Sequence, residues 1–316
     1  MPLKLDKTIT DSLVKHILTG RYNGNIPLLL LYVPFGIVLF ILRLFYGFHV
    51  MLISLILPWS FQLKHHLLRI CFLLLGIRLK ADGSLPPNTS LIVSNKTSPL
   101  DHVLLSLLFT RIHSTAFMEE MSQVEAFLFG IKFLVKRTDF SKFLLSNEGF
   151  PLLIQPEFRI VPSMRAMYRF KHEHFHALQK VTPIAITVSR PLLLQCSCFR
   201  SSKYLDLLLY LFVPITNVSV KILPSVEKSD TEGSNAFLFR ISEAIAKAGE
   251  LEILPFDEVD CEQYMKQYNT KVAAHQSPGK FLAAISAGND IKSVHERYQQ
   301  MLEEERSKYL RRKDLD

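Results

Sequence analysis

A long and almost uncharged stretch near the amino terminus, residues 26–63, is the feature that most restricts how this chain folds. Arg43 is its only Lys, Arg, Asp or Glu. As helices, residues 26–42 and residues 44–63 would each reach about 25–30 Å, which matches the hydrocarbon core of a bilayer. Two crossings and a hairpin both fit this length. Because Pro34 would kink a helix, a re-entrant wedge in one leaflet is as plausible as a full crossing. A buried core hairpin of a soluble protein is the remaining alternative.

Basic residues flank this stretch on both sides. Those before it are Lys4, Lys7, Lys15 and Arg21, and those after it are Lys64, His65, His66 and Arg69. Because the cytosolic side of a membrane segment is enriched in Lys and Arg, we expect both termini in the cytosol. The stretch starts too late and is too long for a cleaved signal peptide. The net charge of +8 then fits an anionic leaflet, and no nucleic-acid partner is expected.

Beyond the apolar stretch, short apolar runs alternate with amphipathic stretches. With 316 residues, of which 48% are hydrophobic, the chain is long enough for one sizeable domain plus additions. The alternation indicates an α/β domain over residues 64–226, preceded by a basic segment at 1–25 and a membrane hairpin at 26–63. Strands are predicted at 90–94, 115–118, 133–135, 151–155 and 183–188, and helices at 100–110, 165–179 and 204–212. The last helix is apolar enough to lie on a bilayer, although a core position is favoured.

The most informative motif is Asn95-Lys96-Thr97-Ser98-Pro99-Leu100-Asp101, at the end of a predicted strand. It resembles the Asn-His-x-Ser-x-x-Asp block of glycerolipid acyltransferases, with Lys96 in the position of the catalytic histidine. A hydroxyl that attacks a thioester needs a base that is largely neutral near pH 7 and is oriented by a carboxylate, here Asp101. A free lysine has a pKa of about 10.4, so only roughly one in 2,500 is neutral at pH 7, and a nearby carboxylate favours the ammonium form. We therefore expect Lys96 and Asp101 to be vestigial catalytic positions.

Three later blocks resemble the remaining signatures of that family, in the same order. Gly130-Ile131-Lys132-Phe133, followed by Arg137, resembles the block whose arginine holds the phosphate of glycerol phosphate. Gln155-Pro156-Glu157-Phe158-Arg159 resembles the Phe-Pro-Glu-Gly block, with Phe158 in place of the glycine, and Thr182-Pro183-Ile184-Ala185 resembles the strand that lines the acyl-binding region. The resemblance implies an acyltransferase-like domain in which Arg137 and Glu157 are weak or vestigial substrate-binding residues. A structural ion pair between these two residues is the alternative.

Two histidine patterns offer other chemistry. His102 follows the motif, but on a helix it would point about 100° away from Asp101, so it is a poor substitute base. His172-Glu173-His174-Phe175-His176 satisfies His-Glu-x-x-His, a zinc-binding pattern on a helix. We reject a metal site there, because no third ligand follows at a short distance and the segment equally fits a helix between two of the acyltransferase blocks.

An apolar hairpin, a degraded acyltransferase domain and a basic helical tail together resemble the ancient ubiquitous protein family. The sharpest match runs from Ile26-Pro27-Leu28 through Leu42-Arg43-Leu44-Phe45 to Gly47-Phe48-His49-Val50 and Leu57-Pro58. The resemblance implies a protein of the endoplasmic reticulum membrane and of lipid droplets, which recruits a ubiquitin-conjugating enzyme for degradation of misfolded proteins and affects droplet clustering. Residues 227–289 are expected to form a helix plus a linker. They lack the family's ubiquitin-binding module, so ubiquitin binding is not expected.

The tail, residues 290–316, is predicted to be an amphipathic helix, because apolar residues recur near helical spacing and charged residues fill the other faces. The resemblance implies that it binds the conjugating enzyme, through Val294, Tyr298, Leu302, Arg306 and Tyr309. A solvated charged helix that packs weakly on its own domain is the alternative. The favoured function is thus a membrane-anchored adaptor without a cofactor. The alternative function is an active acyl-coenzyme A-dependent lysophospholipid acyltransferase that uses Lys96.

Overall fold

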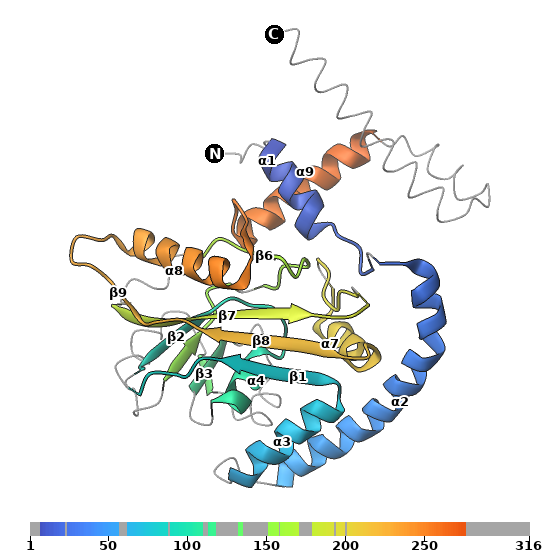
Figure 1. Cartoon of the computed structure of the whole chain (residues 1–316). Helices are drawn as coiled ribbons and strands as arrows, with labels where there is room; N and C mark the ends of the chain where they lie inside the picture. Colours follow the sequence, from blue (N-terminus) through green and yellow to red (C-terminus); the bar gives the residue numbers. More distant parts are fainter. Residues whose placement is uncertain are drawn as a thin grey trace. The chain divides into compact units, whose positions relative to one another are not determined.

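The computed structural model describes residues 7–22, 24–56, 62–87, 89–109, 113–117, 132–134, 151–157, 159–170, 179–192, 194–199 and 201–275. The chain divides into two compact units, residues 1–262 and residues 263–316. The first unit contains a sheet and the helices that cover it (Figure 1). Of the second unit, the structure describes the last part of helix α9 (Glu258–His275), which begins in the first unit.

A mixed sheet forms the centre of the first unit. Within the described residues its strand order is β1-β8-β7-β2-β5-β3-β4, and β9 pairs with β7. The strands are β1 (Ile77–Asp82), β2 (Leu91–Ser94), β3 (His113–Phe117), β4 (Lys132–Leu134), β5 (Leu152–Ile154), β7 (Lys180–Ser189), β8 (Thr216–Ile222) and β9 (Val226–Glu227). Neighbouring strands run parallel, except that β8 and β9 run antiparallel to β7. Parallel strands of this kind need helices on both faces.

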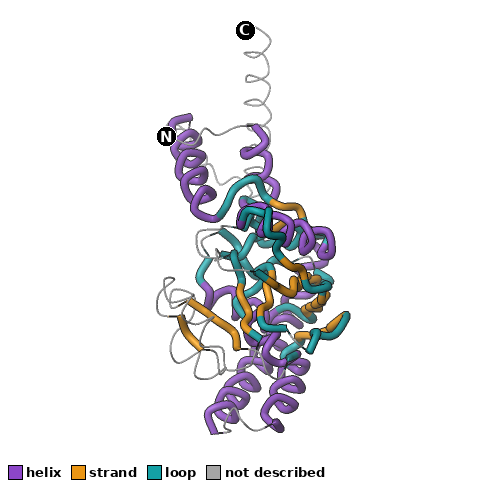
Figure 2. The backbone as a smooth tube through the Cα atoms, turned by 90° about the vertical axis from the view of Figure 1, so that its left-hand side faces the viewer, coloured by secondary structure: helices purple, strands orange, loops and turns teal. Residues whose placement is uncertain are grey.

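Helices cover both faces of the sheet. Since successive strand residues point to opposite sides, Ile92 of β2 joins a core cluster with α3 (Gln62–Leu74), α4 (Asp101–Leu108) and α7 (Lys203–Phe212). Its neighbours Leu91 and Val93 join the cluster on the other side, to which α8 (Ser234–Gly249) contributes Ile241 and Ile245. Figure 2 shows the strands with helices on either side. The core of the sheet therefore includes a helix that follows residue 226.

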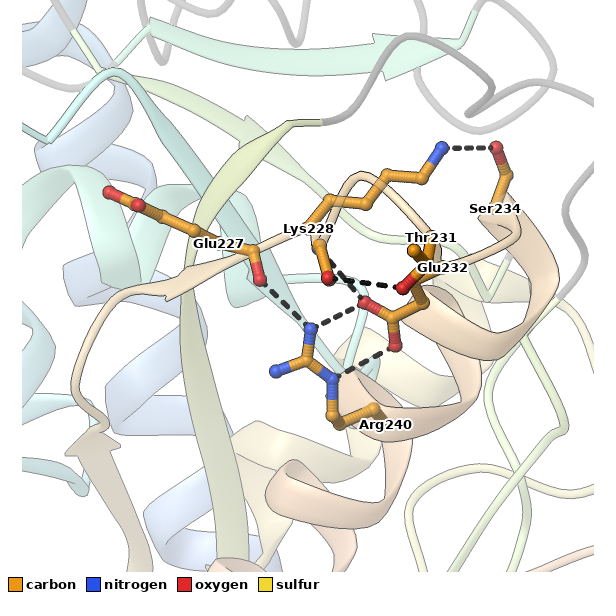
Figure 3. A network of polar contacts seen from close by, with 7 residues as sticks. Glu227, Lys228, Thr231, Glu232, Ser234 and Arg240 are labelled. Atoms are coloured by element: carbon orange, nitrogen blue, oxygen red, sulfur yellow. Dashed lines mark hydrogen bonds and ion pairs between the residues drawn. The ribbon is translucent and has the colours of Figure 1, made fainter.

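A polar network holds the start of α8 beside β9 (Figure 3). The guanidinium of Arg240 donates to the carboxylate of Glu232 at 2.6 and 3.1 Å and to the carbonyl of Glu227 at 2.9 Å. The ammonium of Lys228 donates to the hydroxyl of Ser234 at 3.1 Å. The Arg240 pair lowers the pKa of Glu232. The turn between β9 and α8 is thus held by an ion pair and hydrogen bonds at the surface.

The segment before the apolar stretch lies against a second, two-stranded sheet. This sheet pairs β6 (Ala166–Met167) with β10 (Glu252–Ile253) in parallel. Helix α1 (Lys7–Ser12) continues into a π-helical turn, η1 (Leu13–Ile17). From that turn, Lys15 and His16 reach the carboxylate of Glu252 at 2.5 and 3.1 Å. The amino-terminal segment is therefore part of the folded unit.

The sequence predicted the α/β class correctly, and most of the elements. The expected strands at 90–94, 115–118, 133–135, 151–155 and 183–188 correspond to β2, β3, β4, β5 and β7. The expected helix at 165–179 is wrong at its start, because Ala166 and Met167 form β6. The backbone carbonyls of Arg165 and Met167 accept from the backbone amides of Glu252 and Leu254. This segment therefore makes its hydrogen bonds to a neighbouring strand and not within a helix. The end of that prediction, with the His172 motif, lies outside the described residues.

The apolar stretch is organised differently from the prediction of two arms separated at Arg43. Helix α2 (Ile26–Ile56) runs through Pro34 and Arg43 without interruption. It contains one segment, Ile26–Val50, that is long and apolar enough to cross a membrane. Helix α3 follows after residue 61 and packs on α2 through the hydroxyl of Tyr46, which lies 3.4 Å from the sulfur of Cys71. The polar side chain that was expected to divide the stretch instead lies within one helix.

Candidate functional site

The motif loop lies at the carboxyl edge of the sheet, where the neighbouring strands β2 and β5 end together and β7 continues beyond them. Strand β2 lies between β5 and β7 and is parallel to both. Asn95 directly follows β2, and Gln155 directly follows β5. In open α/β sheets this edge is the usual location of a binding site. The blocks that the sequence placed far apart are therefore brought to one place.

Asp101 holds the motif loop through a dense set of hydrogen bonds. Its carboxylate accepts from the amide and hydroxyl of Thr97 at 2.6 and 3.0 Å. It accepts from the amide and hydroxyl of Ser98 at 3.0 and 2.6 Å, and from the amide of Gln155 at 3.4 Å. Burial raises the pKa of Asp101, and the bonds from Ser98 and Thr97 oppose this. The carboxylate thus acts as a clamp on the loop.

Asn95 and Gln155 extend this clamp across the sheet. The side-chain amide of Asn95 donates to the carbonyl of Ile186 on β7 at 2.9 Å and accepts from the amide of Ile186 at 2.8 Å. The amide of Gln155 donates to the carbonyl of Asn95 at 3.0 Å. Both side chains are buried, and a buried amide with satisfied hydrogen bonds fixes one geometry. The motif's polar residues therefore join the ends of β2 and β5 to β7.

Glu157 connects the first and third blocks. Its carboxylate accepts from the backbone amide of Lys96 at 2.6 Å and from the backbone amide of Tyr168 at 2.5 Å. The side chain is 1% exposed. Burial raises the pKa of Glu157 to about 8, with a further contribution from Glu258, while the two amides pull in the other direction. Glu157 thus positions the backbone at residue 96, which is a structural use of the residue.

The two side chains that the sequence offers as a base, Lys96 and His102, are both buried. Lys96 is 9% exposed at the wall of a cavity, and His102 on α4 is 4% exposed. Burial, and then the charge of Lys96, lower the pKa of His102 to about 3. His102 is therefore a neutral buried imidazole. The carboxylate that would orient a base is held by Thr97 and Ser98.

The cavity beside Lys96 is small. Its volume is about 20 Å³, and Arg190 and Tyr210 form part of its wall together with Asn95 and Thr97. The guanidinium of Arg190 lies 4.8 Å from the ring centre of Tyr210. This volume holds about one water molecule, far less than a glycerolipid. This cavity is therefore too small to hold a lipid.

A second functional feature is the buried guanidinium of Arg43 on α2. It donates to the carbonyls of Leu211, Val213 and Pro214 at 3.2, 2.5 and 2.6 Å. The last carbonyls of a helix lack intrahelical partners and carry partial negative charge, so Arg43 caps the carboxyl end of α7. Gly76 has a φ of +86°, and a Cβ there would collide with this guanidinium. The single charge of the apolar stretch therefore joins α2 to the domain.

The side of α2 that faces away from Arg43 is exposed. Exposed apolar side chains occur along its length, and they are Ile26, Leu28, Leu30, Leu31, Phe35, Ile37, Val38, Ile41, Leu42, Leu44, Phe45, Phe48, Leu52 and Ile56. A monomeric soluble protein rarely exposes so large an apolar surface, which normally marks a membrane or protein contact. One narrow stripe of α2 thus faces protein, and the rest is suited to lipid.

Comparison with known proteins finds relatives along most of the chain. A homologue of the lipid droplet-regulating VLDL assembly factor AUP1 from Caenorhabditis elegans is 27% identical over 252 residues, which are 76% of this chain and 63% of that protein. AUP1 of Mus musculus is 28% identical over 274 residues, 83% of this chain and 65% of that protein. AUP1 of Homo sapiens is 30% identical over 227 residues, 69% of this chain and 54% of that protein. The resemblance to the ancient ubiquitous protein family is confirmed.

The chain spans about half to two thirds of the length of these AUP1 proteins. No family model matches the chain. Among solved structures, the 1-acyl-sn-glycerophosphate acyltransferase PlsC from Thermotoga maritima has a TM-score of 0.48 and 16% sequence identity. The match covers 69% of this chain and 97% of that one.

The structure brings together part of the predicted site. Lys96, Asp101 and Glu157 meet at the motif edge. Arg137 lies outside the described residues, as do the predicted partner-binding residues Val294, Tyr298, Leu302, Arg306 and Tyr309. Their roles stay predictions. Sequence analysis missed Arg190 and Tyr210, which belong to no motif block. It also missed the capping role of Arg43, although a lone charge in an apolar helix is itself a sign of a buried partner.

Proposed function

We propose that this chain is a membrane-anchored adaptor of the endoplasmic reticulum and lipid droplets, whose acyltransferase-like domain serves as a platform and not as a catalyst. In this proposal residues 26–63 anchor the chain, residues 64–226 form the platform, and residues 290–316 recruit a ubiquitin-conjugating enzyme for degradation of misfolded proteins. Droplet clustering follows from the same anchor. Both termini face the cytosol.

The anchoring part is supported by α2 and by the relatives. The apolar side of α2 is exposed along the helix, and water is an unfavourable neighbour for it. The AUP1 proteins that resemble this chain are named as lipid droplet-regulating factors. Because α2 is joined to the domain through Arg43, the chain is suited to sit on one leaflet. A lipid droplet is bounded by a single monolayer, so a droplet protein must bind in this way.

The observation that carries the platform part is the hydrogen bonding of Asp101. A catalytic acid–base pair requires the carboxylate to orient the base. Here the carboxylate accepts from both the amides and the hydroxyls of Thr97 and Ser98, and Lys96 stands at the base position. Glu157 is likewise committed to two backbone amides. The retained residues of the motif therefore keep the edge of the sheet in shape.

The recruitment part is tested by recovery of ubiquitin-conjugating enzymes on immobilised full chain in detergent. The unmodified chain is compared with a chain that ends at residue 289 and with a Tyr298→Ala/Leu302→Ala variant. Glu304→Ala is the matched control on the same segment. We expect recovery to fall at least about tenfold in the shortened chain and in the double variant, and to be unchanged in the control. Equal recovery by all four chains would remove the tail from the proposal while leaving the anchor and platform in place.

A further inference from the structure

Helix α7 has its polar and apolar sides reversed relative to a water-facing surface helix. Tyr204, Leu205 and Leu208 form its outer face and are 63%, 46% and 40% exposed. Its only acidic residue, Asp206, is 3% exposed and points into the protein. A helix on a water-facing surface turns its charges outward and its leucines inward. The outer face of α7 is therefore suited to an apolar environment.

The inward charge of α7 is compensated inside the protein. The carboxylate of Asp206 accepts from the hydroxyl of Ser201 at 2.6 Å and lies 3.4 Å from the guanidinium of Arg21. Arg21 also donates to the carbonyl of Cys196 at 2.6 Å. A buried carboxylate needs such partners. Its position is therefore built into the fold, and the outer face is left without a charge of its own.

The carboxyl end of α7 packs against α2. The ring of Phe212, at the end of α7, packs edge-on against Tyr32 at 5.5 Å between ring centres, and the hydroxyl of Tyr32 donates to the carbonyl of Phe212 at 2.7 Å. A Cβ at Gly36 would lie 2.5 Å from the ring of Phe212, so the two helices are in close contact. Arg43 of α2 donates to the carbonyls of Val213 and Pro214 at the same junction.

We propose that α7 is a second lipid-contacting element, whose outer face enters the same phospholipid leaflet as α2. The proposal rests on the anchoring part of the proposed function. Two observations favour lipid as the occupant: the contact of α7 with α2, which carries the exposed apolar side chains, and the arrangement at the amino end of α7. There the ammonium of Lys203 lies 5.5 Å from the ring centre of Tyr204. A tyrosine beside a lysine at the rim of an apolar face is typical of the boundary between headgroups and acyl chains.

This contact determines where the motif edge lies relative to the membrane. Tyr210, on the inner side of α7, lines the cavity beside Lys96. Only the width of one helix, about 10 Å, separates the outer face of α7 from that cavity. The vestigial site is therefore held just above the acyl chains, with α7 as the wall between them.

Depth-dependent quenching of tryptophan fluorescence tests this proposal on the full chain. The single tryptophan, Trp59, is replaced by phenylalanine, and Leu208→Trp places one probe on the outer face of α7. Phe239→Trp is the matched control, since Phe239 is a 51% exposed apolar residue on α8, across the sheet. Both proteins are bound to phosphatidylcholine–phosphatidylserine vesicles that carry brominated acyl chains. We expect loss of about half or more of the emission for the probe on α7 and about a tenth or less for the control.

A charge substitution gives a second, independent readout. Leu205→Glu/Leu208→Glu should weaken partition into the same vesicles about tenfold, because two leucines no longer enter the acyl region. Phe239→Glu should leave partition unchanged. Vesicle-bound protein with equal quenching at positions 208 and 239 overturns the role of α7 and leaves anchoring by α2 intact. A full chain that does not bind vesicles at all contradicts the anchoring itself. If the glutamate variant instead dissociates a dimer in detergent and quenching is absent, a second copy covers this face, and the proposal is wrong.

Discussion

The backbone amide of Lys96 lies 2.6 Å from the carboxylate of Glu157, so the loop at the base position is held by the block that follows β5. The same carboxylate accepts from the amide of Tyr168 at 2.5 Å. The backbone segments at Lys96 and Tyr168, which are far apart in the chain, thus share one buried acid. In this protein the acid serves the geometry of the sheet edge, and this has consequences for stability that can be measured.

Glu157 should make stability depend on pH. The pKa of this carboxyl is raised from 4.5 to about 8 by burial. Between these values the folded chain keeps a proton that the unfolded chain has released, so its contribution is fully present below pH 4.5 and is lost as the pH rises through 8. The contribution is at most about 5 kcal/mol. The pKa of His102 is lowered from 6.5 to about 3, so this residue makes stability rise with pH between these two values. We therefore expect a net fall in stability between pH 6.5 and 8.

The measurement is denaturant unfolding of the detergent-solubilised chain at several pH values, for the unmodified protein and for Glu157→Gln. The glutamine has no proton to lose, so its stability should decline less over this interval. Parallel curves for the two proteins would show that Glu157 ionises normally in the folded state.

Asp101→Asn should destabilise the protein by about 2–4 kcal/mol. The amide of asparagine presents donors to the amides and hydroxyls of Thr97 and Ser98, which leaves buried donors without an acceptor. Asp82→Asn, at an exposed position at the end of β1, is the matched control and should change stability by less than about 0.5 kcal/mol. Thermal unfolding in detergent measures both. Equal melting of the two variants would contradict the clamp.

Arg43→Met should also destabilise the chain, by about 2–4 kcal/mol, because three carbonyls at the end of α7 lose their donor. Leu42→Met, at an exposed position of the same helix, serves as control. Vesicle binding should persist in both, since the apolar side of α2 is unchanged. Loss of vesicle binding with unchanged thermal stability would mean that Arg43 faces the lipid and not α7.

The glycosylation sequons that begin at Asn88, Asn95 and Asn217 test the orientation. The structure shows which of them is informative. Asn95 is 2% exposed and bonded to Ile186, so it is not available to a glycosyltransferase in the folded chain. Asn217 on β8 is exposed. We expect Asn217 to remain unmodified in cells, because the proposed topology places the domain in the cytosol. A glycosidase-sensitive shift that Asn217→Gln abolishes would place the domain in the lumen.

The sequence predicted what depends on local pattern. The buried run before Asn95 predicted β2, and the apolar run at 204–212 predicted α7, since period and composition determine such elements. It mispredicted residues 165–167, because their partner, β10, is far away in the chain. The buried position of Asp206 and the capping of α7 by Arg43 were also not predictable from the sequence, for the same reason. Each depends on contacts across more than 150 residues, as between Arg43 and Val213 or Arg21 and Asp206, which no local pattern encodes.

The central claim, that the motif edge holds its shape and does not turn over substrate, is tested most directly by acyl transfer. Purified full chain in vesicles is given radiolabelled acyl-coenzyme A with a panel of lysophospholipids and lysophosphatidic acid. An active acyltransferase serves as positive control, and Lys96→Ala and Lys96→His are assayed alongside. We expect the unmodified chain and Lys96→Ala to give the same background incorporation. Incorporation well above background that requires Lys96 would contradict it.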